Sequence, residues 1–110
     1  MDTVTLYSTW PTLESAEAAA RALLEERLIA CANIVPGVRS VFRWKGQIQV
    51  EAEVAMFAKT SADRAAGARD LLLRLHPYET PCLTAFPIMA EASNSAFLNW
   101  VAAETASLPE

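Results

Sequence analysis

The stretch CANIVPGVRSVFRWKGQIQVEAEVAMFAKT, residues 31–60, decides the fold of this chain, because it predicts two long strands joined by a tight turn. We expect the first strand over Ala30–Phe42 and the second over Gln47–Lys59. Pro36 and Gly37 predict a bend or a bulge in the first strand, since neither residue sits well in a regular central ladder.

The turn of this hairpin is expected to be a three-residue loop, Trp44-Lys45-Gly46, with Gly46 in the left-handed conformation. That register places Arg39 opposite Glu51 on the polar face, which is a favourable cross-strand pair. It also puts the apolar even-numbered residues on the other face: Val38, Phe42, Ile48, Val50, Ala52 and Val54.

The second strand is too long for a compact domain of this size. It would span roughly 40 Å at about 3.4 Å per residue, whereas a domain of this length has a diameter of roughly 34 Å. The hairpin tip, apolar at Phe42, Trp44, Ile48 and Val50, must therefore overhang its own domain. Monomers seldom leave such a ribbon in water, so we expect a closed homo-oligomer in which each hairpin lies on a neighbour.

Hydrophobic periodicity and capping residues predict the elements around the hairpin. Before it we expect a strand over Thr3–Trp10 and a helix that is capped by Thr12 and runs to Ile29. After it we expect a helix from Ser61 to Leu75, a strand over Cys82–Ile88 and a last helix over residues 96–108, capped by Asn94 or Ser95. Gly67 lowers helix propensity, so it is expected to mark a close packing contact.

The helices carry apolar stripes that should face a sheet. The predicted inward residues are Leu13, Ala16, Ala20, Leu23, Leu24 and Leu28, then Ala65, Ala68, Leu72 and Leu75, and finally Phe97, Trp100 and Val101. The order strand, helix, strand, strand, helix, strand predicts an α+β, ferredoxin-like βαββαβ sandwich with a long central hairpin and an extra C-terminal helix. We expect one domain, residues 1–110, with the first hairpin strand and the last strand at opposite sheet edges.

Composition narrows the class of protein. The formal net charge of −4 argues against a nucleic-acid or anionic-membrane binder, which needs a basic face. No apolar run approaches the roughly 20 residues of a membrane span, and the N-terminal MDTVTL lacks a signal-peptide core. We therefore expect a cytoplasmic protein in which Cys31 and Cys82 are buried free thiols.

The only histidine, His76, stands in LHPYETP, residues 75–81, where Pro77 ends the preceding helix. Imidazole is a common metal ligand, but a single histidine excludes a two-histidine zinc motif. Tyr78 and Glu79 beside it favour a polar cluster in a cleft. A helix terminator with a purely structural histidine is the alternative interpretation.

Two other features carry weaker signals. Glu51 and Glu53 share one strand face and are suitable as paired carboxylates or metal ligands, although we favour a solvated face that answers Arg39. Lys59 precedes a helix N-terminus, where an anion could bind, or it is an ordinary surface side chain.

Four motifs, in this order, carry a resemblance to a known family: ACANIVPGVRSVFRWKGQIQ at 30–49, KT at 59–60, LHPYETP at 75–81 and FLNWV at 97–101. With them the chain resembles the CutA family, the divalent-cation tolerance proteins, over nearly all of its 110 residues. The resemblance implies a ferredoxin-like homotrimer, a link to tolerance of copper and other divalent ions, and no enzymatic activity.

The copper-binding members of that family resemble one another in a first-strand cysteine and a histidine pair. In this chain those positions read Ser8 and Leu75-His76. The resemblance therefore leaves His76 and Cys31 as candidate ligands for copper or another divalent cation, with further ligands donated across the trimer.

The family also resembles the PII signalling proteins, which hold small anionic ligands in clefts between subunits. The alternative function is therefore a PII-like protein with an intersubunit cleft lined by Lys59, Tyr78 and Glu79, together with His76.

Overall fold

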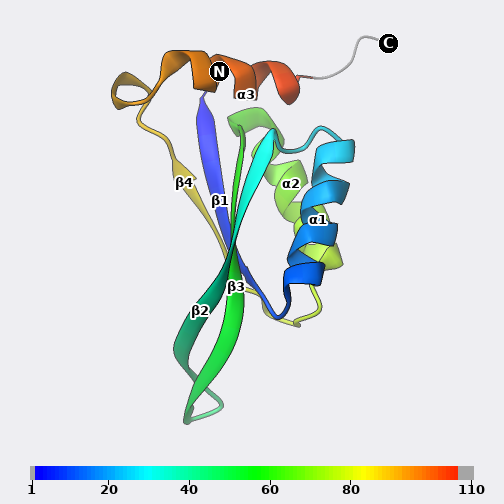
Figure 1. The fold of residues 1–110 in the computed structure, drawn as a ribbon, viewed down its shortest axis with the longest axis vertical. Coiled ribbons are helices and arrows are strands. Elements are labelled where there is room, and N and C mark those ends of the chain that lie inside the picture. The colour runs from blue at the N-terminus through cyan, green and yellow to red at the C-terminus, as the bar shows by residue number, and fades with distance from the viewer. Residues whose placement is uncertain (1, 107–110) are drawn as a thin grey trace.

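The computed structural model describes residues 2–106 as a four-stranded sheet with helices (Figure 1). In chain order the elements are β1 (Thr3–Trp10), α1 (Leu13–Glu25), β2 (Cys31–Trp44), β3 (Gln47–Ser61), α2 (Ala62–Leu75), β4 (Leu83–Pro87), the 3-10 helix η1 (Ala90–Ala92) and α3 (Ser95–Glu104). This order confirms the predicted α+β, ferredoxin-like architecture with an added C-terminal helix. Ser107 and Leu108, where the last helix was expected to end, lie outside the described residues.

The sheet has the strand order β2-β3-β1-β4, so β2 and β4 form its two edges as predicted. Helices α1 and α2 lie on one face, and α3 crosses the end of the sheet that is far from the hairpin tip (Figure 1). Leu6 and Trp10 of β1 point into the core beneath the helices. Side chains alternate along a strand, so Tyr7 and Thr9 lie on the opposite side, which we call the open face.

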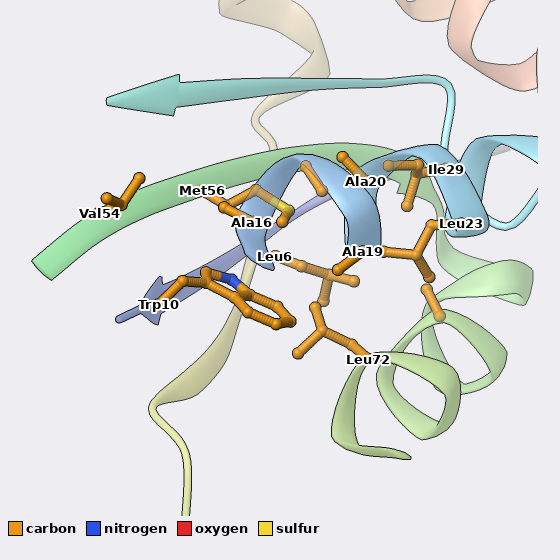
Figure 2. Packing of buried hydrophobic residues seen from close by; sticks show 12 residues of the cluster. Leu6, Trp10, Ala16, Ala19, Ala20, Leu23, Ile29, Val54, Met56 and Leu72 are labelled. Carbon is orange, nitrogen blue, oxygen red and sulfur yellow. The ribbon is translucent and has the colours of Figure 1, made fainter. Parts of the chain in front are cut away.

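The core between the sheet and the two helices is well defined (Figure 2). Four elements, β1, β3, α1 and α2, contribute Leu6, Trp10, Met56, Leu23 and Leu72 to it, and each of these side chains is 2% exposed or less. Truncating a buried leucine such as Leu72 to alanine costs about 2–5 kcal/mol in proteins generally. This core holds the end of β1 rigidly, and the site described below is built on that end.

Helix α1 ends at Glu25. The apolar periodicity had predicted that it would run to Ile29. Arg27 adopts a left-handed conformation with φ +56°, and the Leu28 N–H donates to the Leu23 carbonyl across 2.9 Å. This is the hydrogen-bond pattern that terminates many helices. The apolar pattern in the sequence continues beyond the end of α1, because Leu28 packs against the core although it lies outside the helix.

The β2–β3 turn has two residues and not the three that were predicted. Trp44 pairs with Gln47, and the loop residues Lys45 and Gly46 have φ values of +50° and +77°. Two successive left-handed residues define a type I′ turn, whose twist matches that of the strands. The expected positive φ of Gly46 is confirmed, but the pairing of the whole hairpin arm is shifted by one residue.

The predicted bulge is confirmed at Pro36-Gly37. Val35 pairs with Ala55 and Val38 with Glu53, so two residues of β2 face one residue of β3. Gly37 has φ +87°, a conformation that a residue with a side chain rarely adopts.

The shifted pairing changes which side chains share a face. Ser40 and not Arg39 faces Glu51, and Phe42 pairs with Gln49. Phe42 therefore lies on the open face together with Trp44, and Ile48 lies on the other side. The prediction that Phe42 and Ile48 share one apolar face is wrong.

The hairpin extends well past α1 and α2, as predicted (Figure 1). The longest dimension of the chain is 48 Å, against 33 and 21 Å for the other two. On the side opposite Phe42, the apolar side chains of Val41, Ile48 and Val50 are 68%, 69% and 51% exposed.

Several helix residues that were predicted to face inward are about two-fifths exposed: Leu13, Leu24, Leu75, Phe97 and Trp100. Of the α3 stripe only Val101 is buried, while the Phe97 and Trp100 rings contact each other with centroids 5.8 Å apart. The stripes were predicted too wide because a narrow sheet covers only the centre of each one. No helix within residues 2–106 is long and apolar enough to cross a membrane.

Candidate functional site

A cleft of about 660 Å³ opens on the open face, where the hairpin arm leaves the body of the sheet. Three segments line it: β1, the β2–β3 hairpin and the segment between α2 and β4. We refer to it as the open-face cleft. It brings together residues singled out in the sequence, because Tyr78 and Glu79 line it together with Glu51 and Glu53.

Carboxylates give the open-face cleft its charge. Glu51 and Glu53 are two residues apart on β3, so their side chains project from the same face. Glu79 faces them from the segment after α2. Among the described residues that line the cleft there is no lysine or arginine. The cleft is therefore acidic.

Tyr78 connects the loop to these carboxylates. Its hydroxyl donates a hydrogen bond of 3.4 Å to Oε2 of Glu53. Burial raises the pKa of Tyr78, and the charge of Glu53, the hydrogen bond to Glu53 and the charge of Glu51 raise it further. A phenol loses its proton less readily beside negative charge, so the negative potential of the two glutamates extends across the cleft.

Aromatic side chains form the apolar walls of the cleft. Phe42 and Trp44 are two residues apart on β2, so both side chains lie on the open face, where they are 38% and 45% exposed. Tyr7 lines the cleft from β1, and its ring contacts that of Phe57 with centroids 5.1 Å apart. The cleft thus combines exposed aromatic faces with carboxylates.

His76 holds the loop that carries Tyr78 and Glu79. The residue follows the last turn of α2 and is 7% exposed. Its ring packs against the Trp10 ring with centroids 4.2 Å apart and against the Tyr78 ring with centroids 4.9 Å apart, both in tilted arrangements. These contacts hold the HPY segment against the sheet.

Both ring nitrogens of His76 are occupied by backbone groups. The Tyr78 N–H donates to Nδ1 across 3.1 Å, so Nδ1 carries no proton, and Nε2–H donates to the Thr9 carbonyl across 2.7 Å. A neutral imidazole binds metal through an unprotonated nitrogen. In this chain the only such nitrogen is already bonded to the Tyr78 amide.

Cys31 and Lys59, the other sequence candidates, lie away from the cleft. They pair across β2 and β3, and Lys59 in turn pairs with Thr5. The Lys59 Nζ donates to Oδ1 of Asn33 across 2.6 Å. Partial burial raises the pKa of the Cys31 thiol, although the charge of Lys59 and a hydrogen bond from its backbone oppose the shift.

A single chain does not assemble a copper site from the predicted ligands. His76 bonds to Thr9, whereas Cys31 lies level with Thr5, four residues away along β1 and thus roughly 14 Å at about 3.4 Å per residue. Within residues 2–106 no group of three or more histidine, cysteine, aspartate or glutamate side chains is placed to hold a metal ion. The ligand set expected for copper therefore does not fit one copy of this chain.

Cys82 is exposed and not buried as expected, and Cys31 is half-buried. Both thiols are free, in agreement with the prediction.

The sequence did not reveal that Glu51 and Glu53 line the cleft. They were interpreted as a solvated face paired with Arg39, but Arg39 lies on the other side of the hairpin, opposite Ala52. Counting residues from a two-residue Lys45-Gly46 turn would have placed both glutamates beside Phe42 and Trp44.

Comparisons with known proteins agree with this fold. Divalent-cation tolerance protein CutA of Archaeoglobus fulgidus is 44% identical over 96 residues, 87% of this chain and 91% of that protein. Protein CutA of Homo sapiens is 36% identical over 104 residues, which are 94% of this chain but 57% of the human protein.

A solved structure extends the likeness to three dimensions. The periplasmic divalent cation tolerance protein CutA of Archaeoglobus fulgidus superposes with a TM-score of 0.89 and 40% identity, over 94% of this chain and 99% of that one. Because that relative is described as periplasmic, it contradicts the cytoplasmic location predicted for this chain, and the prediction is corrected.

The family model described as CutA1 divalent ion tolerance protein matches residues 4–104, almost the whole described part of the chain. The match includes the long hairpin, the HPY segment and α3. The chain belongs to the family of CutA1 divalent ion tolerance proteins.

Proposed function

We propose that this protein acts in divalent-cation tolerance as a non-catalytic homotrimer whose hairpin arms lie on neighbouring copies. The observation that carries the proposal is the exposed apolar side of the arm, formed by Val41, Ile48 and Val50. Within residues 2–106 no other element reaches this side beyond the helices (Figure 1). Contiguous exposed apolar surface of this kind usually marks a protein interface.

The position of His76 supports a role without catalysis. A general acid or base needs a nitrogen within reach of its substrate. The Nδ1 and Nε2 atoms of His76 instead bond to backbone groups of Tyr78 and Thr9.

Cation contact then depends on assembly. Since residues 2–106 of one chain do not assemble a copper site, a copper ion would need ligands from more than one copy, with Cys31 and His76 as the candidates within each. In this arrangement the protein influences divalent cations through the interfaces between copies and not through a site inside one subunit.

The PII-like alternative, a small anionic ligand in a cleft, has less support. Tyr78 and Glu79 share their cleft with Glu51 and Glu53, whose charge would repel an anion. Lys59, the cation expected there, is bonded to Asn33 on another part of the sheet.

Sedimentation velocity tests the assembly. The expected species has three times the 12.0 kDa mass of the chain. Ile48→Lys should produce smaller species, because a lysine cannot be buried in an apolar interface without a partner. Leu24→Lys is the matched control. Leu24 has the same size as Ile48 and is also exposed, but it lies on α1 and not on the arm. A wild-type monomer at micromolar concentration would contradict the proposal.

Copper titration and growth assays test the role in tolerance. Cells that carry the wild-type protein should grow at higher copper concentrations than cells that carry Ile48→Lys, with equal protein levels confirmed by blotting. Calorimetric copper binding should weaken in Cys31→Ser. Equal tolerance in cells with and without the protein would refute the function.

A further inference from the structure

The C-terminal helix α3 is attached to the fold in a different way from α1 and α2. It crosses the end of the sheet and contacts β1 and β3 (Figure 1), but of its side chains, all of which are described, only Val101 is buried. Val101 does not belong to the core cluster between the sheet and the other two helices. Apolar burial therefore contributes little to the docking of α3, and polar contacts hold the helix in place.

A buried pair of hydroxyl groups joins the C-terminal end of α3 to β3. Ser61 and Thr105 are 3% and 1% exposed, and their side-chain oxygens lie 2.7 Å apart. The Thr105 hydroxyl donates to the Val101 carbonyl across 2.8 Å, so Ser61 is the donor within the pair. A buried hydroxyl group without a partner is unfavourable, so each of these two residues stabilises the position of the other.

Two arginines cap the same end of the helix. Nη1 of Arg27 donates to the Glu104 carbonyl across 3.0 Å, and Nε of Arg64 donates to the Thr105 carbonyl across 2.8 Å. The last carbonyl groups of a helix lack partners within it, and positive charge beside them is favourable. The end of α3 is thus bonded to β3, to α2 and to the segment after α1. We call Ser61, Thr105, Arg27 and Arg64 the α3 clasp.

The N-terminal half of α3 lacks such an attachment. Asn94 caps it from the adjoining segment by accepting the N–H groups of Ala96 and Phe97. The Phe97 and Trp100 rings contact each other and remain exposed. Within residues 2–106, no hydrogen bond joins this half of the helix to another element of the fold.

We propose that α3 is a strap across the end of the sheet, closed by the α3 clasp, and that opening the clasp undocks the helix as a unit while the core stays folded. Segments with few buried apolar contacts open at a lower free energy than the core of a protein. The core cluster of the described residues contains no residue of α3, so it does not depend on the strap. Undocking carries Phe97 and Trp100 away from the sheet. The clasp contains none of the residues on which the proposed function rests, so either proposal can fail without the other.

Native-state hydrogen exchange of the full chain in its assembled form, measured by NMR, tests the proposal. In the wild type the amides of residues 98–104 should be at least about tenfold less protected than the most protected amides of β1, because undocking exposes α3 without unfolding the core. Equal protection of α3 and β1 would mean that the helix leaves only when the whole protein unfolds, and would overturn the proposal.

Two matched threonine variants separate undocking from global unfolding. Thr105→Val and Thr60→Val each remove one buried hydroxyl, but the Thr60 hydroxyl donates to the Leu28 carbonyl across 2.7 Å, outside the clasp. Thr105→Val should speed the exchange of α3 by about tenfold or more. Thr60→Val should speed the exchange of β1 and leave that of α3 unchanged. If both variants speed α3 equally, the helix has no opening of its own and the proposal is overturned.

Arg27→Gln keeps the test valid if Thr105→Val fails to fold, because the Arg27 side chain is 38% exposed. It removes the hydrogen bond to the Glu104 carbonyl and should speed the exchange of α3 by about threefold or more. Arg21→Gln, which removes the same charge from the exposed surface of α1, should leave the exchange of α3 unchanged. Equal exchange of α3 in these two variants would overturn the proposal.

Discussion

His76 donates a hydrogen bond from Nε2 to the carbonyl oxygen of Thr9 across 2.7 Å, which joins the segment after α2 to the end of β1. The same ring accepts the Tyr78 N–H at Nδ1. The one histidine of the chain is therefore a structural bridge, and it positions Tyr78 and Glu79 over the open-face cleft.

Removing the His76 ring should destabilise the fold. His76→Ala loses a buried stacking contact with Trp10 and leaves the Thr9 carbonyl without its donor, so we expect a loss of about 2–4 kcal/mol in the free energy of unfolding. Guanidinium denaturation measures it. Leu75→Ala, at the exposed neighbouring residue, should cost less than about 1 kcal/mol. Equal losses would show that the bridge contributes little.

Tyr78 should make stability depend on alkaline pH. Its pKa in the folded state is raised above the usual value of 10.0 by burial and by Glu53 and Glu51. Its stabilising contribution is thus complete below about pH 10 and is lost as the pH rises through the folded pKa. The effect should be modest because the side chain is 40% exposed.

Urea unfolding between pH 8 and 11, compared for the wild type and Tyr78→Phe, isolates this contribution from other titrating groups. The wild type should lose more stability than the variant over the alkaline end of the range. Parallel curves for the two proteins would contradict the prediction.

Gly67 and Leu28 should show coupled effects on stability. A Cβ at position 67 would lie 3.0 Å from Cδ2 of Leu28. Gly67→Ala gains helix propensity of up to about 1 kcal/mol, but it must displace the end of the Leu28 side chain. In the wild-type background we expect these effects to offset each other.

In a Leu28→Ala background the obstacle is gone, so Gly67→Ala should stabilise by about 0.5–1 kcal/mol. A double-mutant cycle of thermal or denaturant unfolding measures the difference. The same gain in both backgrounds would mean that Leu28 moves aside without cost.

The type I′ turn at the hairpin tip should respond to residues that favour positive φ. Lys45 has φ +50°, so Lys45→Asn should stabilise by about 0.5–1 kcal/mol, because asparagine tolerates the left-handed conformation. Gly46→Ala, at φ +77°, should destabilise by about 1–2 kcal/mol. Lys45→Gln is the control for loss of the charge. If all three variants had the same stability, the turn geometry would be in doubt.

Much of the fold could be predicted from the sequence because several local signals agreed. The alternation in Thr3–Trp10, the Thr12 cap and the Pro36-Gly37 pair each have a single simple interpretation, and the structure confirms all three. The overhang of the arm could be predicted from the length of the second hairpin strand alone, because this length does not depend on which residues pair across the hairpin.

The candidate site was harder, because it depends on register and on packing. An error of one residue in the Trp44–Gln47 turn moved Phe42 to the wrong face and hid its proximity to Glu51. The role of His76 depends on its contact with Thr9, which is 67 residues away in sequence. Tyr78 and Glu79 were found because they lie next to His76, but their partners on β3 were not.

The bulge at Pro36-Gly37 separates the pairing register of the arm from that of the sheet behind it. It uses one more residue in β2 than in β3, and beyond it Ser40 and Phe42 share a side with Glu51. Deleting one residue of this pair would leave a single residue of β2 opposite Val54 and a regular ladder, so Ser40 would still face Glu51 and Phe42 would still face Gln49. A single codon lost at this point would therefore straighten the strand and keep the acidic aromatic surface intact.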